Sequence, residues 1–363
     1  MSSQPEARLA AAPPLRRSPQ VLADFAAALF AAAGMDGEKA ATMARLLVLT
    51  DMMGRHTHGL AQCNAYLQEI AQGRMACVGE PEVVRDTGAT LVWDGGYRPG
   101  LWLVDRAIAL AAERVAEAGV VTMAIRRSHH IGCLAALAKA ATDRGLYVML
   151  ASSGPHSRIV APFGGKAPLF SPNPFAIGFP TAQAPVLVDI SASLTTASMT
   201  REKAAAGEQF EHPWLMDSEG RPTRDPTVME SAGARGSLLL LGGYEAGHKG
   251  FGLALMVEAL TQGLGGYGRR DAPDRWGAAV FLQLIDPAAF AGAEAFVAQT
   301  EFFAEQCRAN PPLDPARPVR LPGEQACRNI AAAERDGLAV PAATAATLAA
   351  WAEKLGVDAT ILC

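Results

Sequence analysis

Apolar residues recur along the chain with two different spacings, and these spacings divide it into predicted helices and strands. Between Val21 and Val48 the apolar residues lie on one helical face, and Gly34 and Gly37 split this stretch into two helices. Residues 82–94 predict a pair of strands joined by a turn. The next segments predict helix, strand, helix and strand in that order: 101–118, 120–125, 133–144 and 146–151. This alternation favours an α/β sheet architecture.

The later part of the chain has a different pattern. Polarity rises from Met199 to Arg235, which predicts a long irregular segment, whereas residues 250–264 and 323–355 have the apolar spacing of helices. The glycine cluster from Gly242 to Gly252 lacks the G-x-G-x-x-G spacing and does not follow the first strand of a βαβ unit. A standard Rossmann domain is therefore not supported.

Composition and charge narrow the class of protein. The chain has 363 residues, of which 50% are hydrophobic and 19% charged, so we expect a globular protein with a large core. The net charge is -4, and no basic tract is long enough to bind nucleic acid. No apolar run reaches the ~18 residues of a membrane span. We therefore expect neither a nucleic-acid partner nor a membrane.

The cysteines and the N-terminus indicate a cytoplasmic protein. Six cysteines are present, with no C-x-x-C pair and no zinc or disulfide spacing, so we expect reduced thiols. Residues 1–19 are rich in proline and alanine, with an arginine pair late in the stretch. A secretory signal has its charges first, so a disordered tail is expected instead.

The most informative stretch is a turn followed by a strand that ends in a carboxylate. Pro172 and Pro174 fix the backbone around Asn173, and the apolar run from Val186 leads to Asp189. A carboxylate at the end of a buried strand usually holds another polar group. The best candidate partner is the segment 54–59, which contains Thr57-His58-Gly59.

Histidine is the side chain best suited to exchange protons near neutral pH, which makes His58 a candidate acid or base. Gly59 allows another group to approach the backbone closely, and Thr57 offers a hydroxyl. The alternative is structural: Thr57 is the N-cap of a helix that begins at Leu60.

A second histidine motif, from Ser128 to Gly132, lies between a predicted strand and a predicted helix. Such a loop can direct backbone N–H groups and the helix dipole towards an anion, for example a cofactor phosphate. The alternative is a surface loop capped by Ser128. The neighbouring His129 and His130 point in different directions and have no H-E-x-x-H spacing, so we expect no metal site.

Two further segments combine glycine with charge. Lys249 stands at the start of an apolar helix, where a cation is unfavourable unless an anion joins it, so a phosphate or carboxylate contact is plausible. The alternative is a flexible hinge with a solvated lysine. The segment from Arg320 to Glu324 contains a Pro-Gly turn, and a simple helix-entry turn explains it without any function.

These motifs occur in the order seen in the malate/L-lactate dehydrogenase type 2 family, which the chain resembles from about residue 20 to residue 357. The matching segments are Thr57–Gly59 with Tyr66 and Gly73, Ser128–Gly132, Asn173-Pro174 with Asp189–Ser191, Gly247–Leu253 and Pro322–Glu324. The family includes ureidoglycolate dehydrogenase, diketogulonate reductase, sulfolactate dehydrogenase and Δ1-piperideine-2-carboxylate reductases.

The resemblance implies a fold and an assembly. The implied fold is an α/β protein with a non-Rossmann NAD(P)-binding domain and a helical domain built from both chain ends. We accordingly expect a tail (1–19), an N-terminal helical part (20–78), an α/β cofactor and substrate domain (79–290) and a C-terminal helical part packed on the N-terminal helices (291–363). The resemblance also implies a homodimer.

The implied activity is NAD(P)H-dependent reduction of a 2-oxo acid or cyclic imino acid, with NAD or NADP left undecided. By residue matching, His58 is the proton donor, and Thr57 and Asp189 complete its charge relay. The implied cofactor contacts are His130, Ile131, Gly132, Cys133, Leu134, Asn173, Pro174, His248, Lys249, Arg320, Pro322, Gly323 and Glu324.

Substrate choice is where the chain departs from the family pattern. Many members have arginine four residues after the catalytic histidine, but this chain has Gln62, which offers only neutral hydrogen bonds. The candidate substrate contacts are Arg55, Gln62, His156 and Arg158, with Lys166 as a further cation. Two alternatives stay open: a non-catalytic cofactor-binding homologue, and a hydrolase that uses Thr57, His58 and Asp189.

Overall fold

The computed structural model describes residues 15–231 and 233–362. Most of the expected disordered tail, residues 1–14, lies outside the described residues. Residues 15–19 were assigned to that tail but are structured: β1 (Leu15–Arg17) pairs antiparallel with β12 (Leu338–Val340), and a helix begins at Pro19. The two ends of the chain are thus joined by backbone hydrogen bonds.

A mixed seven-stranded sheet forms the centre of the molecule, in the order β2-β3-β4-β11-β5-β6-β7. The strands are β2 (Glu82–Asp86), β3 (Thr90–Asp94), β4 (Val120–Ser128), β5 (Tyr147–Ser153), β6 (Phe175–Phe179), β7 (Val186–Ile190) and β11 (Ala278–Ile285). β3 and β4 are parallel, and the other neighbours are antiparallel. The late strand β11 lies between β4 and β5, which no doubly wound dinucleotide fold has. The expected non-Rossmann α/β class is confirmed.

Helices cover both faces of this sheet. On one face, α4 (Gly100–Ala118) and α5 (Leu134–Thr142) pack on β4, β5, β6 and β11. On the other face, α8 (His248–Glu258) continues into a single π-helical turn, η4 (Ala259–Gly263). The predicted helix over 250–264 is therefore present, with one wide turn near its end. The main core fills the space between α4, α5, the sheet and the N-terminal helices.

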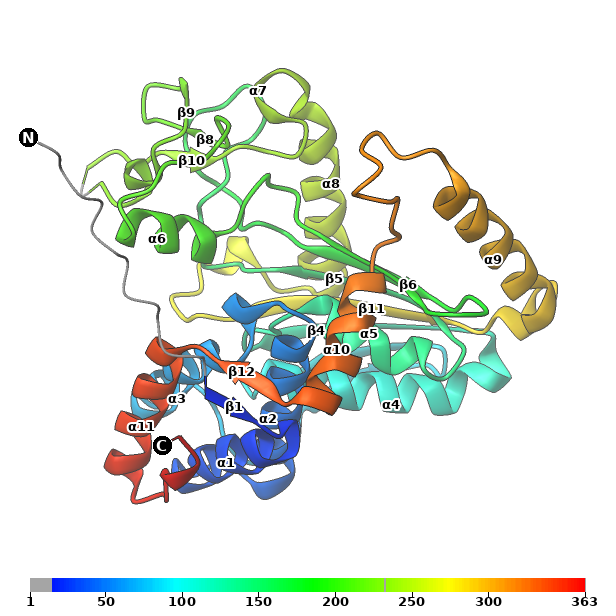
Figure 1. The fold of residues 1–363 in the computed structure, drawn as a ribbon, viewed down its shortest axis with the longest axis horizontal. Coiled ribbons are helices and arrows are strands. Elements are labelled where there is room, and N and C mark those ends of the chain that lie inside the picture. Colours follow the sequence, from blue (N-terminus) through cyan, green and yellow to red (C-terminus); the bar gives the residue numbers. More distant parts are fainter. Residues whose placement is uncertain (1–14, 232, 363) are drawn as a thin grey trace, which may run out of the picture.

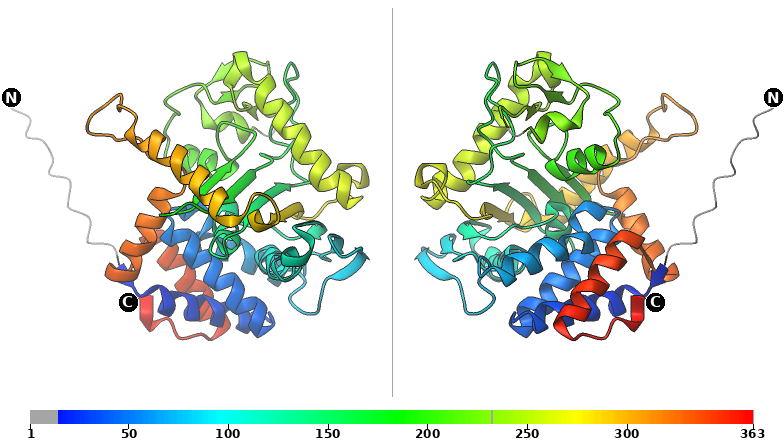
Figure 2. Two further views of the ribbon diagram at one scale, coloured as in Figure 1. Left: turned by 90° about the vertical axis from the view of Figure 1, so that its right-hand side faces the viewer. Right: turned by 90° about the vertical axis from the view of Figure 1, so that its left-hand side faces the viewer.

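The helical body combines both ends of the chain (Figures 1 and 2). It contains α1 (Pro19–Ala32), α2 (Gly37–Met52), α3 (Cys63–Ala71), α10 (Glu324–Asp336) and α11 (Ala342–Leu355). α11 contacts α1 and α3, and α10 contacts α2. α2 also contacts α4 and α5, which joins this body to the sheet.

The long helix α9 (Ala293–Ala309) lies apart from the helical body (Figure 1). It packs beside β6, where Thr300 donates a hydrogen bond to the Pro180 carbonyl and Phe303 contacts Phe179. Within the range 291–363, α10 and α11 thus pack on the N-terminal helices and α9 does not. The division into four domain ranges otherwise stays a prediction.

A smaller lobe lies beyond one end of the sheet. It is built from α6 (Ala197–Ala205), β8 (Leu215–Met216), β9 (Pro222–Thr223), β10 (Ser237–Leu238) and α7 (Gly243–Ala246). The segment expected to be irregular therefore contains short regular elements around a small core that includes Phe170 and Phe210. The short helical turns of the chain are η1 (His56–His58), η2 (Leu60–Gln62), η3 (Pro226–Met229), η5 (Arg269–Asp271), η6 (Pro287–Ala289) and η7 (Thr360–Leu362).

The expectations on membrane spans and on cysteines can be compared with the described part of the chain. None of its helices is both long and apolar enough to cross a bilayer. Its five cysteines, at positions 63, 77, 133, 307 and 327, are all free thiols.

Candidate functional site

Asp51, near the end of α2, fixes the turn that carries His58. Its buried carboxylate accepts the Leu60 N–H at 2.8 Å and lies 3.0 Å from His56 Nδ1. A Cβ atom on Gly59 would come within 2.2 Å of the same carboxylate, so position 59 has no room for a side chain. The group that approaches Gly59 closely is thus another part of the protein.

His58 is half-buried at the end of η1. Its Nδ1 lies 2.9 Å from the Thr57 hydroxyl, and the Gln62 amide donates to the Thr57 carbonyl at 2.7 Å. The alternative role of Thr57 as a helix N-cap is wrong, because η2 begins after Gly59 and α3 only at Cys63. Thr57 is instead positioned as a direct partner of the imidazole.

The charge around His58 comes from two residues. Burial lowers the pKa of His58 below its usual value, the Asp189 carboxylate acts in the opposite direction, and the Arg55 guanidinium adds to the lowering. No hydrogen bond joins His58 to Asp189 in residues 15–231 and 233–362. The expected relay contact is therefore not direct, and Asp189 acts on His58 through its electric field.

The Asp189 carboxylate is held at the N-terminus of α5. Its Oδ2 accepts the Ala135 N–H at 3.0 Å and lies 3.5 Å from the Cys133 thiol. A negative charge is stabilised at this end of a helix. The N-terminus of α5 after the Ser128 loop thus already holds an anion, which is a carboxylate of the protein itself. Whether the loop also contacts a cofactor stays a prediction. Burial and Asp189 raise the pKa of Cys133 to about 12, so its thiol stays protonated.

An aromatic cluster surrounds His130. The Tyr66 hydroxyl lies 2.8 Å from His130 Nδ1, and the ring of Trp276 lies 5.0 Å from the His130 ring. Burial raises the pKa of Tyr66, so the phenol donates, and burial together with nearby histidines lowers the pKa of His130 well below its usual value. A neutral ring that accepts at Nδ1 carries its proton on Nε2. The His58 and His130 rings lie 6.0 Å apart.

Two more histidines complete the cluster. His129 is fully buried, its Nε2 is 3.5 Å from Glu69, and Arg74 pairs with the same Glu69. Burial lowers the pKa of His129 to about 4, and the pKa of His156 is also lowered, by burial and by Arg269. Nδ1 of His129 and Nδ1 of His156 are buried without a hydrogen-bond partner in the described chain.

The described residues bring no three His, Cys, Asp or Glu side chains together in a metal-binding group. The histidine cluster is thus arranged around hydrogen bonds and aromatic contacts, with burial keeping the rings neutral.

The Asn173 side chain is engaged in hydrogen bonds within the fold. It is fully buried at φ 46°, and its amide donates to the Ala254 carbonyl and to Glu258. Arg269 pairs with Glu258 and donates to the carbonyls of Pro155 and Ser157. Both amide protons of Asn173 are therefore engaged, so a cofactor contact from this residue would have to come from its backbone. Pro174 accepts the Ser152 N–H through its carbonyl.

The turn at Pro322 packs on the outer edge of β7. The Leu187 N–H donates to the Pro322 carbonyl at 2.9 Å, and Gly323 has φ +99° with its Cβ position 2.9 Å from Leu187 N. Glu324 forms an ion pair with Arg308 at 2.6 Å. This turn therefore sits two residues from Asp189 along the same strand, and Arg320 at its start donates to Gln325.

His248 and Lys249 are exposed at the start of α8. The helix is held by Gly250, whose Cβ position lies 2.4 Å from Leu241 N and 2.7 Å from the Ala192 carbonyl. Ala192 follows β7, so Lys249 begins a helix anchored to the continuation of the Asp189 strand. Within the described residues Lys249 makes no ion pair.

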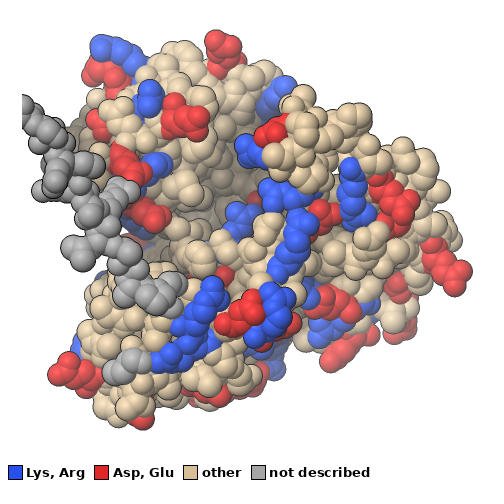
Figure 3. All heavy atoms as spheres, viewed as in Figure 1, with Lys and Arg blue, Asp and Glu red and all other residues tan. Residues whose placement is uncertain are grey.

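The structure therefore gathers the predicted residues along one strand and its continuation. His58, Thr57 and Arg55 lie in the field of Asp189, and the Pro322 turn and α8 flank β7. Arg158 is exposed, and Lys166 lines a separate cavity described below. Figure 3 shows the surface hollowed between the smaller lobe and the helical body, with lysine and arginine side chains along one margin.

Sequence reasoning gave no role to the residues that support this site. No motif includes Asp51, Trp276, Glu258 or Arg269, and Tyr66 appears only as part of the Thr57–Gly59 motif. Trp276 and Arg269 have partners more than 100 residues away, so no local pattern could have found these contacts. Asp51 has its partners only 5 and 9 residues away, but nothing in the local sequence marks it as the anchor of the turn.

Comparison with known proteins finds relatives that match nearly the whole chain. Residues 18–349 match the model of the malate/L-lactate dehydrogenase family. Hydroxycarboxylate dehydrogenase B of Escherichia coli K12 is 30% identical over 93% of this chain and 94% of its own. The Δ1-pyrroline-2-carboxylate reductase of Ancylobacter novellus is 30% identical over 88% of this chain and 92% of its own. The solved structure of a putative malate/lactate dehydrogenase from E. coli superposes with a TM-score of 0.86 at 28% identity, over 96% of this chain and 97% of that one.

The buried His129 predicts acid sensitivity of the fold. Its pKa is about 4 in the folded chain and 6.5 as a free side chain. Between these two pH values the unfolded chain therefore binds a proton on His129 and the folded chain does not. Stability is therefore complete above pH 6.5 and falls as the pH drops towards 4, with a share from His129 of about 2 kcal/mol at pH 5. Urea unfolding at pH 7.5 and pH 5 measures this loss.

The matched variant is His129→Asn, which keeps a polar side chain beside Glu69 but has no proton to gain. We expect its loss of stability between the two pH values to be smaller by about 2 kcal/mol than that of the natural chain. An unchanged difference would remove His129 as a source of the acid sensitivity.

Proposed function

The chain belongs to the malate/L-lactate dehydrogenase family, whose members are NAD(P)-dependent dehydrogenases of hydroxy acids and reductases of imino acids, and we propose the reaction that it catalyses within that range. The reaction interconverts a 2-oxo acid or cyclic imino acid with the corresponding L-2-hydroxy acid or amino acid. One observation supports this most: a half-buried histidine, bonded to a hydroxyl, stands in the field of a carboxylate that no cation neutralises through an ion pair in the described chain.

The residues around β7 fit a dinucleotide. Lys249 is a cation without an ion pair in the described residues, which suits a phosphate, and the Pro322-Gly323 turn leaves backbone close to the strand that carries Asp189. When bound, NAD(P)H supplies the hydride. We propose that Lys249 and His248, the Pro322–Glu324 turn with Arg320, and residues 130–134 hold it. Asn173 would contribute through its backbone, and Pro174 through its half-buried ring, since its carbonyl already accepts the Ser152 N–H. Whether the chain prefers NAD or NADP stays open.

His58 has the properties that a proton donor to the substrate requires. Reduction of a C=O or C=N group adds a hydride to carbon and a proton to oxygen or nitrogen. Burial alone would leave the imidazole neutral, and the Asp189 charge opposes this and favours the protonated ring. In the reverse direction the neutral ring accepts the proton. The Thr57 hydroxyl, 2.9 Å from Nδ1, fixes the orientation of the ring.

Arg55 is the best placed cation for a substrate carboxylate. Its charge acts on both His58 and Cys133, so it lies beside the reacting centre. Gln62 is occupied, since its amide holds the Thr57 carbonyl, and we assign it to the support of the turn. His156 would contribute its buried, unpartnered Nδ1, and Arg158 its exposed guanidinium.

A hydrolase that uses Thr57 as nucleophile is less well supported. The hydroxyl does contact the imidazole, but no carboxylate in the described part of the chain accepts a hydrogen bond from the other ring nitrogen. A nucleophilic triad needs that third group to orient the base. The remaining alternative is a homologue that binds the cofactor but has no activity. Turnover of any substrate in the panel would exclude it.

We further propose that the protein acts as a cytoplasmic homodimer. The outward face of α8 and its extension is apolar, with Leu255, Met256 and Leu264 exposed, and free thiols suit a reducing compartment. Sedimentation equilibrium of the purified protein measures the assembly, and a monomer at every concentration would exclude it.

The function is tested with purified protein, both cofactors and a panel of 2-oxo acids and cyclic imino acids, followed at the nicotinamide absorbance band. For the active pair, His58→Ala should lower kcat by at least about 100-fold and leave the Kd of the cofactor nearly unchanged. The matched control is His56→Ala, two residues away and largely exposed, with an expected change below about threefold. Full activity in His58→Ala would remove this residue from the mechanism.

The role of Asp189 predicts a change in the pH profile. Asp189→Asn keeps an oxygen that can accept the Ala135 N–H but removes the charge that favours protonated His58. The pKa of His58 should then fall further, so the decline of reductive kcat with rising pH moves to lower pH. Cofactor-saturated rates across the pH range measure the shift. A profile that keeps its midpoint would mean that Asp189 serves only as the cap of α5.

A further inference from the structure

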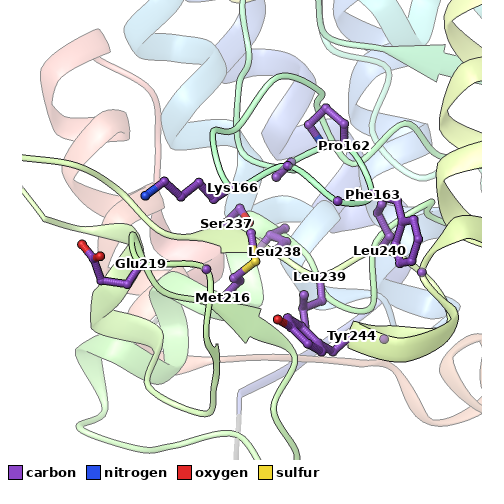
Figure 4. Close-up of a pocket in the computed structure, with 16 residues that line it drawn as sticks. Pro162, Phe163, Lys166, Met216, Glu219, Ser237, Leu238, Leu239, Leu240 and Tyr244 are labelled. Atoms are coloured by element: carbon purple, nitrogen blue, oxygen red, sulfur yellow. The ribbon is translucent and has the colours of Figure 1, made fainter.

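A second cavity, separate from the histidine cluster, lies in the smaller lobe (Figure 4). Its volume is about 430 Å³, within the range of about 300–1,000 Å³ typical of small-molecule sites. Segment 161–166, the β8 turn and β10 form its walls, with Gly243–Gly247 at one side. The apolar part of the lining is Phe163, Met216, Leu239 and Tyr244. None of these residues belongs to the site proposed above.

One wall carries a polar atom that the protein leaves unsatisfied. Ser237 is fully buried, and its Oγ has no hydrogen-bond partner in the described residues. A buried hydroxyl without a partner costs free energy, so such groups are rare in native proteins. Because Ser237 lines the cavity, a ligand in that space can supply the missing hydrogen bond.

The remaining polar groups are two opposite charges. Lys166 and Glu219 both line the cavity, and neither makes an ion pair in the described chain. Figure 4 shows the Lys166 side chain extending beside Ser237, with Met216 drawn next to Ser237 and Tyr244 further away. The cation suits a carboxylate, whereas Glu219 would repel a second negative charge.

We propose that this cavity binds a monocarboxylic acid with a compact branched or aromatic body. The apolar body lies between Phe163, Met216 and Tyr244, the carboxylate pairs with Lys166, and Ser237 donates to a carboxylate oxygen. A neutral molecule of the same shape lacks the charged contact, and a dicarboxylate meets Glu219. The proposal does not depend on the reaction assigned above.

A ligand in the cavity would lie next to the segment proposed to bind the cofactor. Gly247 belongs to the wall and directly precedes His248, and the Phe163 ring lies 5.8 Å from the His248 ring. A ligand held against Phe163 therefore borders the start of α8. The site is well placed to change cofactor affinity, as a second site rather than as part of the first.

The test is calorimetric titration of the full chain with 3-phenylpropanoate. We expect saturable binding with a Kd between about 10 µM and 1 mM, tenfold or more weaker for 3-phenylpropan-1-ol and for phenylsuccinate. Acetate, which has no apolar body, should show no saturation below about 10 mM. Equal affinity of the acid and the alcohol, or no binding of either, overturns the proposal.

Variants locate the binding. Lys166→Gln and Ser237→Ala should each weaken 3-phenylpropanoate about tenfold, while Lys354→Gln on α11, the matched surface control, leaves it unchanged. Arg55→Gln should also leave it unchanged, which separates this cavity from the histidine site. Loss of binding in Arg55→Gln alone, or strictly competitive displacement of the probe with no limit as NADH or NADPH rises, assigns the probe to the other site and overturns the proposal.

Discussion

The Asp189 carboxylate at the N-terminus of α5 is the contact on which the candidate site depends. It joins the end of an edge strand to a helix on one face of the sheet, through the Ala135 N–H at 3.0 Å. A negative charge is favourable at this end of a helix, and Asp189 forms no ion pair within the described residues. Its charge raises the pKa of His58, whereas burial and the Arg55 guanidinium both lower it. One carboxylate thus ties the strand to α5 and also acts on the pKa of His58, the proposed proton donor.

The other buried histidines show why this matters. Glu69 is the carboxylate near His129 and His156, but Arg74 pairs with it and cancels much of its field. His130 has no compensating carboxylate at all, and the Tyr66 hydroxyl bonds its Nδ1 instead. These rings are accordingly neutral. Of the four histidines, only His58 is both partly exposed and acted on by a carboxylate that forms no ion pair in the described residues. This combination distinguishes it chemically from the other three.

Much of the fold could be predicted because the signals were local. The strand pair over 82–94 and the helix over 101–118 appear within one residue of their predicted ends, since apolar spacing and glycine stops are properties of adjacent residues. The insertion of β11 between β4 and β5 could not be predicted, because it depends on pairing across more than 100 residues. The same limit applies to the site. Motif order made His58 and Asp189 candidates, but it did not predict that α5 would hold the carboxylate.

The position of Asp189 also constrains how a dinucleotide can be held. In a Rossmann domain the first helix N-terminus binds the pyrophosphate through its free N–H groups. Here the corresponding helix start is already neutralised by the protein's own anion, so a phosphate at that point would face a like charge. Compensation has to come from side chains, and the candidate is Lys249, which precedes Gly250, the residue that packs against the backbone following β7. On the proposed function, the missing glycine fingerprint and the lysine at a helix start are related: the dipole of α5 stabilises the Asp189 charge, and a side chain would contact the phosphate.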